Sequence, residues 1–418
     1  FLESFSNNSI RKADASVTGS PRNLNFYVDR TKYFLGLLGN PENGFKYIHI
    51  TGTAGKGSVS TMLHDILVQS GKKAGIFTSP YVTTTIEQIK VSELFIAPDE
   101  FVDIAESLKP FMEQAKESDF GIPSAFELLF VVSILYFKRQ QCEWVVLEVG
   151  MGGRYDATNV IEKAEVAAIT NIGLDHTDIL GKTVEEIAYD KMGIIKPGCA
   201  FFTSEQRPEL QKMFEECCKS LDAKHSSISR QKSYSAYNAE LVRAICRHLK
   251  VDEKFVERGI THLQLPCRFE IMQVAPCIVL DGAHNKPKTA STITNLAKLD
   301  FDKLFLVLTV SDTKDEKTDI VQPLMTTGHE AHAYICQISA NERKSVSPNF
   351  LLPIAQQYLK EGGTVEIIEN PQDALDAAIG KAGKNDLILV TGSFFLAGEL
   401  RKRWIPEKWV LENRRSFR

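Results

Sequence analysis

Hydrophobic residues follow two patterns along the chain, and the two patterns alternate from one end to the other. Short runs of consecutive apolar residues, many of them β-branched, are typical of parallel strands that are buried on both faces. These runs predict one strand that ends near residue 51 and others at 74–78, 144–149, 166–170, 269–274, 278–281, 304–310, 332–335, 364–368 and 387–391.

Between these runs, apolar residues recur at helical spacing and predict amphipathic helices. We expect helices at 22–38, 237–249, 287–298, 347–360, 372–380 and 394–403, with others that follow residue 58 and begin at Pro98 and at the capping sequence after Thr183. The run at 124–137 is apolar nearly all round, as in a core helix. Alternating strands and helices predict an α/β fold with a mostly parallel sheet. Leu265-Pro266 suggests a boundary between domains 1–264 and 265–418.

The first predicted strand runs directly into a glycine-rich turn, Thr51-Gly-Thr-Ala-Gly-Lys-Gly-Ser58, with a helix after it. Such a turn lets backbone N–H groups approach a phosphate, and the start of the helix adds partial positive charge. Lys56 can neutralise phosphate oxygens, and the Ser58 hydroxyl can ligate Mg²⁺. The turn therefore indicates nucleoside triphosphate binding, although glycine-rich turns also join strands to helices for steric reasons alone.

A second polar feature is Glu148, which lies inside the apolar run 144–149. A buried carboxylate is costly unless it is paired or bound to a metal. Since the strand is expected near the glycine-rich turn, magnesium is one partner for Glu148. The alternatives are an ion pair with Arg154 and the capping of a loop.

Three further positions carry polar chemistry beside predicted elements. His176 follows the strand 166–170, and Asp281 and His284 follow the strand 278–281, so they belong to sheet edges where α/β proteins bind ligands. A plain loop histidine and simple turn chemistry are the competing interpretations. Lys191 lies in a predicted helix, where composition alone predicts a solvated surface charge.

Composition narrows the class of protein. The 418-residue chain has 43% hydrophobic and 24% charged residues, as in an ordinary soluble globular protein. Its net charge of −4 supplies no general attraction for nucleic acid, so neither nucleic acid nor a membrane is expected as a partner. The 8 cysteines are scattered and suggest reduced thiols in the cytoplasm. Because the sequence begins with Phe1, an organelle-targeting segment that has been removed is kept as an alternative.

Taken together, these motifs resemble the folylpolyglutamate synthase/dihydrofolate synthase family, within the Mur ligase superfamily. The resemblance extends from about residue 22 to 404 and rests on an ordered set: 51–58, Thr78-Ser-Pro80, 147–159, Asp175-His176, Asp190-Lys-Met-Gly193, Asp281-Gly-Ala-His-Asn285 and Thr391-Gly-Ser393. It implies a P-loop-containing, parallel-sheet N-terminal ATPase domain and a smaller Rossmann-like α/β C-terminal domain.

The resemblance also implies an activity. A carboxylate of folate or dihydropteroate would attack the γ-phosphate of ATP, and L-glutamate would displace phosphate from the resulting acyl phosphate. ATP and Mg²⁺ are the implied cofactors, with a monovalent cation as a further candidate, and a monomer is expected. Two rivals are another Mur-type amino-acid ligase and a P-loop nucleotide switch that makes no covalent product.

Site residues follow by position from the same resemblance. Those implied for ATP are Gly52, Gly55, Lys56, Gly57, Ser58, Asn238, Arg268 and Asp281. Those implied for metal are Ser58, Ser79, Glu148 and His176. Catalytic roles fall on Lys56, on His284 beside the reacting phosphate and on Lys191 as a carbamylated lysine. Those implied for substrate are Phe126, Tyr155, Asp156 and Ser393, the last for glutamate.

The chain departs from the family pattern at four positions. Ala54 stands where the family usually has Asn, and Gln88 stands where it has Arg. Tyr81 replaces a common His, and Asp190 replaces Glu before the lysine. The changes at Ala54 and Gln88 bear on rate or substrate choice, and we expect nucleotide binding to survive them.

Overall fold

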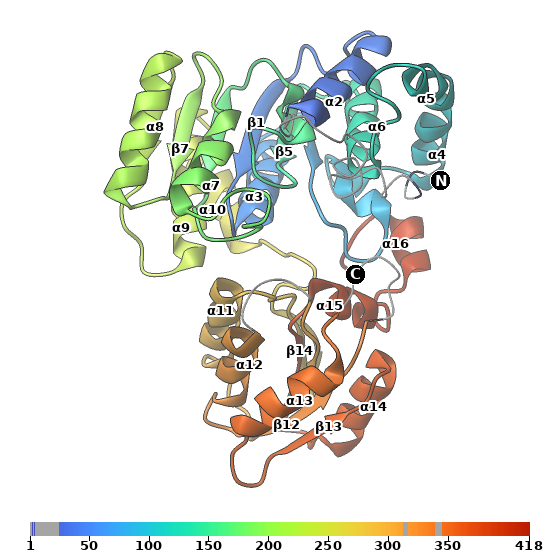
Figure 1. Cartoon of the computed structure of the whole chain (residues 1–418), viewed down its shortest axis with the longest axis vertical. Coiled ribbons are helices and arrows are strands. Elements are labelled where there is room, and N and C mark those ends of the chain that lie inside the picture. The colour runs from blue at the N-terminus through green and yellow to red at the C-terminus, as the bar shows by residue number, and fades with distance from the viewer. Residues whose placement is uncertain (1, 3, 5–24, 312–316, 339–344) are drawn as a thin grey trace. The chain divides into compact units, whose positions relative to one another are not determined.

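The structure, a computed structural model, describes residues 2, 4, 25–311, 317–338 and 345–418 (Figure 1). The chain divides into two compact units. The first holds the described residues up to Tyr81 together with Thr85–Leu263, and the second holds Val82–Thr84 together with Gln264–Arg418. The sequence places the division one residue later and does not predict that 82–84 belong with the second unit.

The first unit contains an eight-stranded sheet in the order β4-β3-β2-β5-β1-β6-β7-β8. Its strands are β1 (Lys46–Thr51), β2 (Ala74–Phe77), β3 (Ile89–Val91), β4 (Leu94–Phe95), β5 (Trp144–Glu148), β6 (Val166–Ile169), β7 (Ala200–Thr203) and β8 (Lys224–Ser227). Neighbouring strands run parallel except in the β2-β3-β4 meander, which is antiparallel. A mostly parallel sheet was predicted, and the prediction is confirmed.

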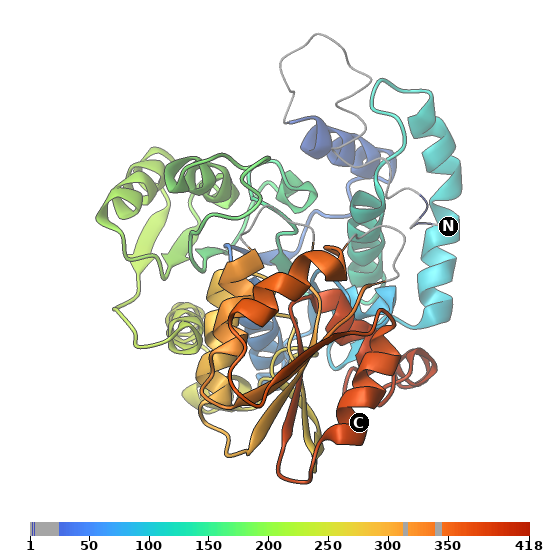
Figure 2. The same cartoon turned by 60° about the horizontal axis from the view of Figure 1, so that its bottom comes forward.

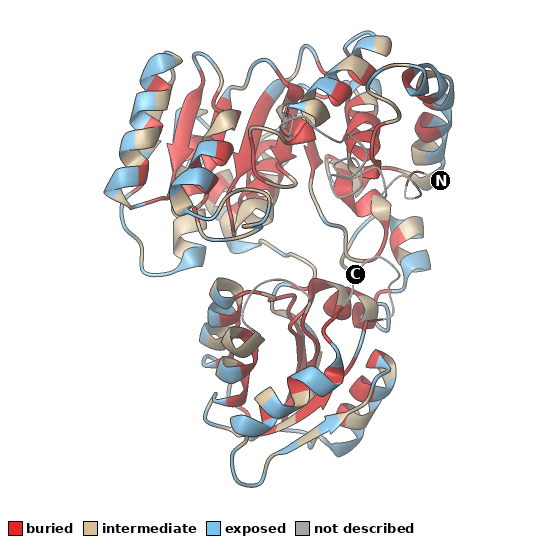
Figure 3. Cartoon of the chain, in the orientation of Figure 1, coloured by how far each residue is buried: buried red, intermediate tan, exposed pale blue. Residues whose placement is uncertain are grey.

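Helices cover both faces of this sheet. They are α2 (Phe26–Leu37), α3 (Lys56–Gln69), α4 (Pro98–Ser107), α5 (Lys109–Lys116), α6 (Ala125–Arg139), α7 (Val184–Lys191), α8 (Pro208–Ser220), α9 (Tyr234–His248) and α10 (Glu253–Thr261), with short 3₁₀ turns η2 (Thr85–Gln88), η3 (Ala157–Val160) and η4 (Met192–Ile194). Helices α3, α9 and α10 share one apolar core with the sheet, and α7 and α8 share another on the opposite face. The central strands β1, β5 and β6 are accordingly buried along almost their whole length, whereas the edge strand β8 is partly exposed (Figure 3).

The second unit contains a six-stranded sheet in the order β13-β12-β11-β14-β10-β9. Its elements are β9 (Glu270–Val274), β10 (Cys277–Leu280), α11 (Lys286–Leu296), β11 (Lys303–Leu308), α12 (Lys317–Met325), β12 (Glu330–Ile335), α13 (Pro348–Gln357), β13 (Thr364–Ile367), α14 (Pro371–Lys381), β14 (Leu387–Thr391), α15 (Phe394–Arg401) and α16 (Glu407–Asn413). The edge strand β9 is antiparallel to β10, and the other pairs are parallel.

Apolar cores lie on both faces of this second sheet as well. Helices α11, α12 and α13 pack on one face, and α14 and α15 pack on the other. In Figure 2, where this unit comes forward, helices flank the twisted strands on both sides. In both units the chain therefore brings the carboxyl ends of parallel strands to one edge of a covered sheet, which is where we expect ligands.

The core helix predicted at 124–137 is α6, and it begins with a capping box. The Ser124 side chain accepts from the Glu127 N–H, and the Glu127 carboxylate accepts from the Ser124 N–H. Among the described residues, no helix is long and apolar enough to cross a membrane.

Candidate active site

The glycine-rich turn between β1 and α3 has a backbone that side chains would block. Gly55 and Gly52 have φ of 86° and 148°, in the region that favours glycine. A Cβ at Gly55 would lie 2.6 Å from Asn238 Oδ1, and a Cβ at Gly52 would overlap the Thr170 hydroxyl. Both glycines are therefore required by the close approach of β6 and α9 to the turn.

The turn is held from the side by the segment that follows β6. The Ala54 N–H donates to Asn171 Oδ1 at 2.8 Å, and the Thr53 N–H donates to the Asn171 carbonyl at 3.0 Å. Helix α3 begins at Lys56, whose Nζ donates to the Gly52 carbonyl at 3.0 Å. Because the first N–H groups of a helix have no partner within it, this fixed turn presents donors and a lysine to an anion.

The predicted proximity of Glu148 to this turn is confirmed. Strands β1 and β5 are parallel neighbours, with Ile50 paired with Glu148. A Cβ at Gly57 would lie 3.5 Å from Glu148 Oε2, so the carboxylate reaches the first turn of α3. The same oxygen accepts from the Ser79 N–H at 3.2 Å. This buried carboxylate beside a phosphate-binding turn fits a hard divalent cation, which prefers oxygen ligands.

The alternative partner of Glu148, Arg154, lies against a different group. Its guanidinium stands 4.3 Å from the ring centroid of Tyr189 and donates to the Tyr189 carbonyl at 3.3 Å. The structure therefore gives Arg154 a cation–π contact on α7.

His176 stands on a loop after β6. It has a positive φ of 49°, its side chain is 54% exposed, and its Nε2 lies 3.8 Å from Asp175 Oδ1. Within the described ranges, no three His, Cys, Asp or Glu side chains gather as a metal site. The structure thus brings Ser79 and Glu148 together but leaves His176 exposed, and its role as a metal ligand stays a prediction.

Lys191 is a buried residue, and the surface position suggested by composition is wrong. It ends α7 and is 3% exposed. Burial, aided by the charge of Lys56, lowers the pKa of Lys191 to about 7, although nearby carboxylates such as Asp190 oppose that shift. A lysine with this pKa is partly neutral near pH 7, so its amine can act as a nucleophile.

Two of the predicted substrate residues, Phe126 and Asp156, converge on the same point. A Cβ at Gly150 would lie 2.6 Å from Phe126 Cζ and 3.2 Å from Asp156 Oδ2. The Phe126 ring also packs on Phe77, with centroids 5.7 Å apart. Tyr155 precedes Asp156 in the chain and is half-buried. The bare backbone at Gly150 therefore lets the Phe126 ring and the Asp156 carboxylate lie close together, which forms a corner with one aromatic and one acidic side.

The Asp156 carboxylate is buried but well supplied with donors. Its Oδ1 accepts from the Thr158 N–H and hydroxyl at 3.0 and 2.6 Å, and its Oδ2 accepts from the Met151 N–H at 3.0 Å. Burial raises the pKa of Asp156, while these hydrogen bonds and the charge of Lys56 act in the opposite direction.

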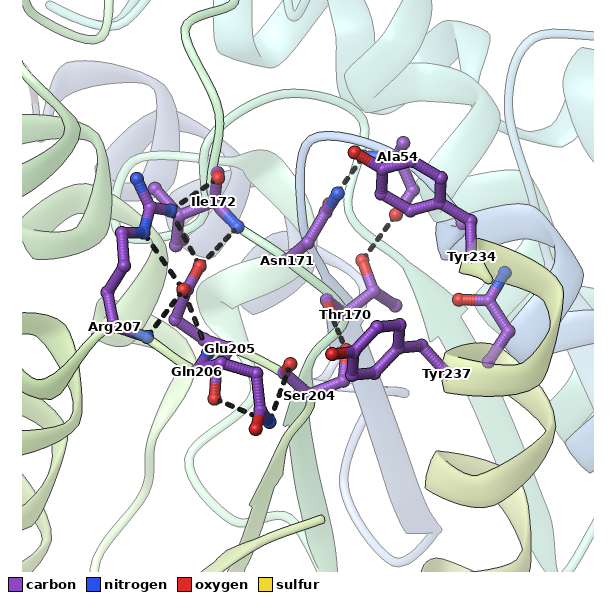
Figure 4. A pocket seen from close by; sticks show the side chains of 12 residues that line it. Ala54, Thr170, Asn171, Ile172, Ser204, Glu205, Gln206, Arg207, Tyr234 and Tyr237 are labelled. Carbon is purple, nitrogen blue, oxygen red and sulfur yellow. Dashed lines mark hydrogen bonds and ion pairs between the residues drawn. The ribbon is translucent and has the colours of Figure 1, made fainter. Parts of the chain in front are cut away.

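A pocket of about 230 Å³ opens beside the glycine-rich turn (Figure 4). It is lined by Ala54, Gly55, Thr170, Asn171, Ile172, Ser204, Glu205, Gln206, Arg207, Tyr234, Tyr237 and Asn238. The two tyrosines come from α9, and on the opposite wall Arg207 Nη2 pairs with Glu205 Oε2 at 2.7 Å (Figure 4). The pocket is therefore continuous with the turn and has aromatic and amide walls.

In the second unit, Asp281 and Arg268 lie beside the end of β10. Asp281 is buried and accepts from the Ala283 and Phe269 N–H groups at 2.8 and 3.0 Å. Burial raises the pKa of Asp281, and the charge of Arg268 opposes the rise. The Arg268 guanidinium lies 4.6 Å from the ring centroid of Phe394.

His284 and Ser393 lie beside the same strand ends. His284 Nδ1 is 2.8 Å from the Gly282 carbonyl, and its Nε2 is 3.0 Å from Lys288 Nζ. Since the carbonyl must accept, Nδ1 carries the proton and Nε2 faces the ammonium. Ser393 is fully buried and caps α15 by accepting from the Phe395 N–H at 3.2 Å.

Comparisons with known proteins agree with this geometry. The Mur ligase middle-domain family matches residues 50–272, more than half of the chain, and the Mur ligase glutamate-ligase domain matches 267–394. The chain belongs to the Mur ligase family. Members of this family are ATP-dependent ligases.

The relatives of this Mur ligase are named as folylpolyglutamate and dihydrofolate synthases. It is 28% identical to the dihydrofolate synthase/folylpolyglutamate synthase of Bacillus subtilis, over 90% of this chain and 94% of that protein. It is 29% identical to the dihydrofolate synthetase of Saccharomyces cerevisiae, over 89% and 96%. The folylpolyglutamate synthase of Mycobacterium tuberculosis, solved with ADP and AMPPCP, superposes with a TM-score of 0.80 at 27% identity, over 90% and 95%.

Several site residues of this Mur ligase escape sequence reasoning. Asn171 is an ordinary polar residue whose contact with Ala54 depends on a fold-back of the chain, and Lys288 is an ordinary lysine four residues after His284. Tyr234 was missed because α9 was expected to begin at 237, although Ser233, which accepts from the Ala236 N–H, is a recognisable helix cap. Gly150 was quoted in a motif but not recognised as the point at which Phe126 and Asp156 meet.

Proposed function

We propose that this Mur ligase adds L-glutamate to a carboxylate of a folate or of dihydropteroate through an acyl phosphate. One observation carries the proposal. The carboxyl edge of the first sheet combines a phosphate-binding turn, a buried carboxylate at that turn and an aromatic corner with a second carboxylate. This combination supports a reaction between two anions, which requires neutralised charge and fixed positions.

ATP would place its phosphates at the turn and its base in the adjoining pocket. The N–H groups of Gly55, Lys56, Gly57 and Ser58 would face the phosphates, with Lys56 Nζ on the transferred group and Gly52 leaving room for it. Asn238 and the two tyrosines of α9 would hold the base, since aromatic rings stack on purines. Arg268 and Asp281 are assigned ATP contacts from the resemblance.

Magnesium is the proposed divalent ion. Glu148 and Ser58 would ligate it, with Ser79 and His176 as further ligands, and a monovalent cation is a second candidate. When bound, the ion would supply positive charge to phosphate oxygens. The chain's own part is to hold the Glu148 carboxylate in place through the Ser79 N–H, which donates at 3.2 Å.

The acceptor would lie in the corner formed by Phe126, Tyr155 and Asp156. A flat pterin ring can stack on Phe126, and its N–H groups can donate to the Asp156 carboxylate. Dihydropteroate and reduced folates share this ring, so the corner fits both acceptors.

Lys191 is proposed to become carbamylated. Its neutral Nζ would attack CO₂, a new N–C bond would form, and one proton would be lost, which converts a cationic side chain into an anion. The lowered pKa of Lys191, about 7, supports this step because the neutral amine is the reacting form.

In the second unit, His284 is proposed to lie beside the reacting phosphate, and Ser393 to help seat the incoming glutamate. The expectations of a monomer, of a cytoplasmic location and of no nucleic-acid or membrane partner remain predictions.

The deciding experiment measures ADP release with Mg²⁺ present, with each substrate omitted in turn, and with dihydropteroate and reduced folates compared side by side. The proposal expects release that requires both glutamate and a pterin acceptor, together with a product one glutamate longer by mass spectrometry. ADP release indifferent to glutamate would instead support a nucleotide switch, and dependence on another amino acid or acceptor would support a different Mur-type ligase.

A further inference from the structure

A buried chain of three polar residues ends at Asp156 behind the acceptor corner, and its other two members have no role assigned so far. It begins at His49, in the middle of β1, two residues before the strand ends. His49 is fully buried, and its Nε2 lies 2.9 Å from Thr158 Oγ1. Thr158, in η3, in turn lies 2.6 Å from Asp156 Oδ1. The chain therefore links the strand that leads into the phosphate-binding turn with the carboxylate of the acceptor corner.

The direction of each hydrogen bond follows from counting protons. An ionised carboxylate can only accept, so the single Thr158 hydroxyl proton points to Asp156 Oδ1. Thr158 Oγ1 then accepts from His49, which fixes the neutral imidazole with its proton on Nε2. Nδ1 of His49 is left as a buried lone pair that has no hydrogen-bond partner among the described residues. Burial, with a contribution from the charge of Lys196, lowers the pKa of His49 to about 3, so the ring stays neutral.

This arrangement leaves one oxygen of Asp156 directed at the acceptor corner. Oδ1 is occupied by the Thr158 hydroxyl and N–H, whereas Oδ2 takes the Met151 N–H and lies 3.2 Å from where a Cβ of Gly150 would stand. A partial rotation of Asp156 about its χ2 would turn the plane of the carboxylate away from the Thr158 N–H and hydroxyl and lose both hydrogen bonds. The His49–Thr158 pair opposes that rotation.

We propose that His49 is a positioning residue for the acceptor: by donating to Thr158, it orients the Thr158 hydroxyl toward Asp156 and so holds Asp156 Oδ2 toward the substrate ring. The inference rests on the proposed function in so far as Asp156 contacts the acceptor. The hydrogen-bond chain itself, in which a neutral histidine with its proton on Nε2 donates to a threonine that donates to a carboxylate, does not depend on the proposed function.

A matched pair of variants tests the role. Gln and Met have similar length and volume, but His49→Gln keeps an N–H near the Nε2 position and His49→Met does not. His49→Met should raise the KM for the pterin acceptor about tenfold, in keeping with one lost buried hydrogen bond, and leave the KM for ATP within about twofold. His49→Gln should stay within about threefold of the wild type in both constants. Equal effects of the two variants, or a parallel rise in the KM for ATP, would overturn the proposal.

A spectroscopic measurement separates failure of this inference from failure of the proposed function. In ¹⁵N-histidine-labelled protein, the His49 signal, assigned as the one absent from His49→Gln, should show the neutral Nε2–H tautomer unchanged over about pH 5 to 8, the range where an ordinary histidine titrates. Thr158→Ser should keep that signature, whereas Thr158→Val should shift it. An Nδ1–H tautomer or a titrating ring would refute the relay, whichever acceptor the enzyme uses.

Discussion

The cationic side chains at the carboxyl edges of the two sheets have different surroundings. At the first edge, Lys191 is buried within reach of the charge of Lys56, and its pKa lies near 7. At the second edge, Arg268 lies over Phe394 and near the buried Asp281, and Lys288 faces the lone pair of His284. The comparison teaches that the first edge can change its charge near neutral pH, whereas the second edge holds its cations against fixed partners.

The largest expected effect comes from removing Lys56, the lysine of the first edge that is proposed to contact the transferred phosphate. Lys56→Met should lower kcat by about 1,000-fold, because a lost contact to developing charge costs about 3–4 kcal/mol. Glutamate-dependent ADP release measures it. Lys32→Met removes an exposed lysine and should leave the rate unchanged. A Lys56 variant with near wild-type turnover would end the assignment of this edge to phosphoryl transfer.

The next largest effect is expected from replacing a glycine by alanine, and it should differ between the two units. Gly55→Ala should weaken nucleotide binding about 30-fold or more, because a strained left-handed alanine that also meets Asn238 costs about 2 kcal/mol or more. Isothermal titration with ADP measures it. Gly380→Ala, in α14 with no atom within 4 Å of its Cβ, should instead stabilise the protein by about 0.5–1 kcal/mol. Equal behaviour of the two alanines would show that the turn is not closely packed.

The pH dependence sharpens the comparison at Lys191. Because burial lowers its pKa to about 7, the reactive neutral amine is lost as the pH falls below that value. Activity should therefore decrease about tenfold per pH unit below 7 if capture of CO₂ limits the active fraction. Bicarbonate should partly restore it. For Lys191→Ala, small carboxylic acids should rescue turnover, and an inactive variant that no acid rescues would contradict the carbamate role.

The smallest effect is expected in the pocket beside the turn. Tyr237→Leu keeps much of the apolar wall but removes the aromatic face, so the KM for ATP should rise about 3- to 10-fold, in line with about 1 kcal/mol for one stacking contact. The KM for glutamate should not change. Tyr189→Leu, on the exposed side of α7, is the matched control for loss of a tyrosine. An unchanged KM for ATP would contradict the proposal that the base of ATP binds in this pocket.

Local sequence signals predicted much of the first edge. The glycine-rich turn, the carboxylate in an apolar strand and the capping box at Thr183 each depend on neighbouring residues, and the structure contains them where they were expected. Several elements, such as α10, α12 and β8, were not named in advance.

Features that depend on long-range packing were beyond the sequence. The burial of Lys191 follows from how the glycine loop 150–154 packs against α7, where a Cβ on Gly153 would lie 2.7 Å from the Lys191 carbonyl. The hydrogen bond from Ala54 to Asn171 joins residues 117 positions apart. No local sequence pattern indicates such contacts. For this reason Lys191 was interpreted from composition as a surface charge.

The assignment of Val82–Thr84 to the second unit has a practical consequence for anyone who wishes to dissect this enzyme. The Val82 carbonyl approaches Gly398 so closely that a methyl group there would lie 2.8 Å from it. A fragment that starts at residue 264 would lack this short inner piece and expose the surface it covers. Splitting the gene once between the units would therefore give an incomplete C-terminal half, and a three-residue patch would have to be grafted back to restore it.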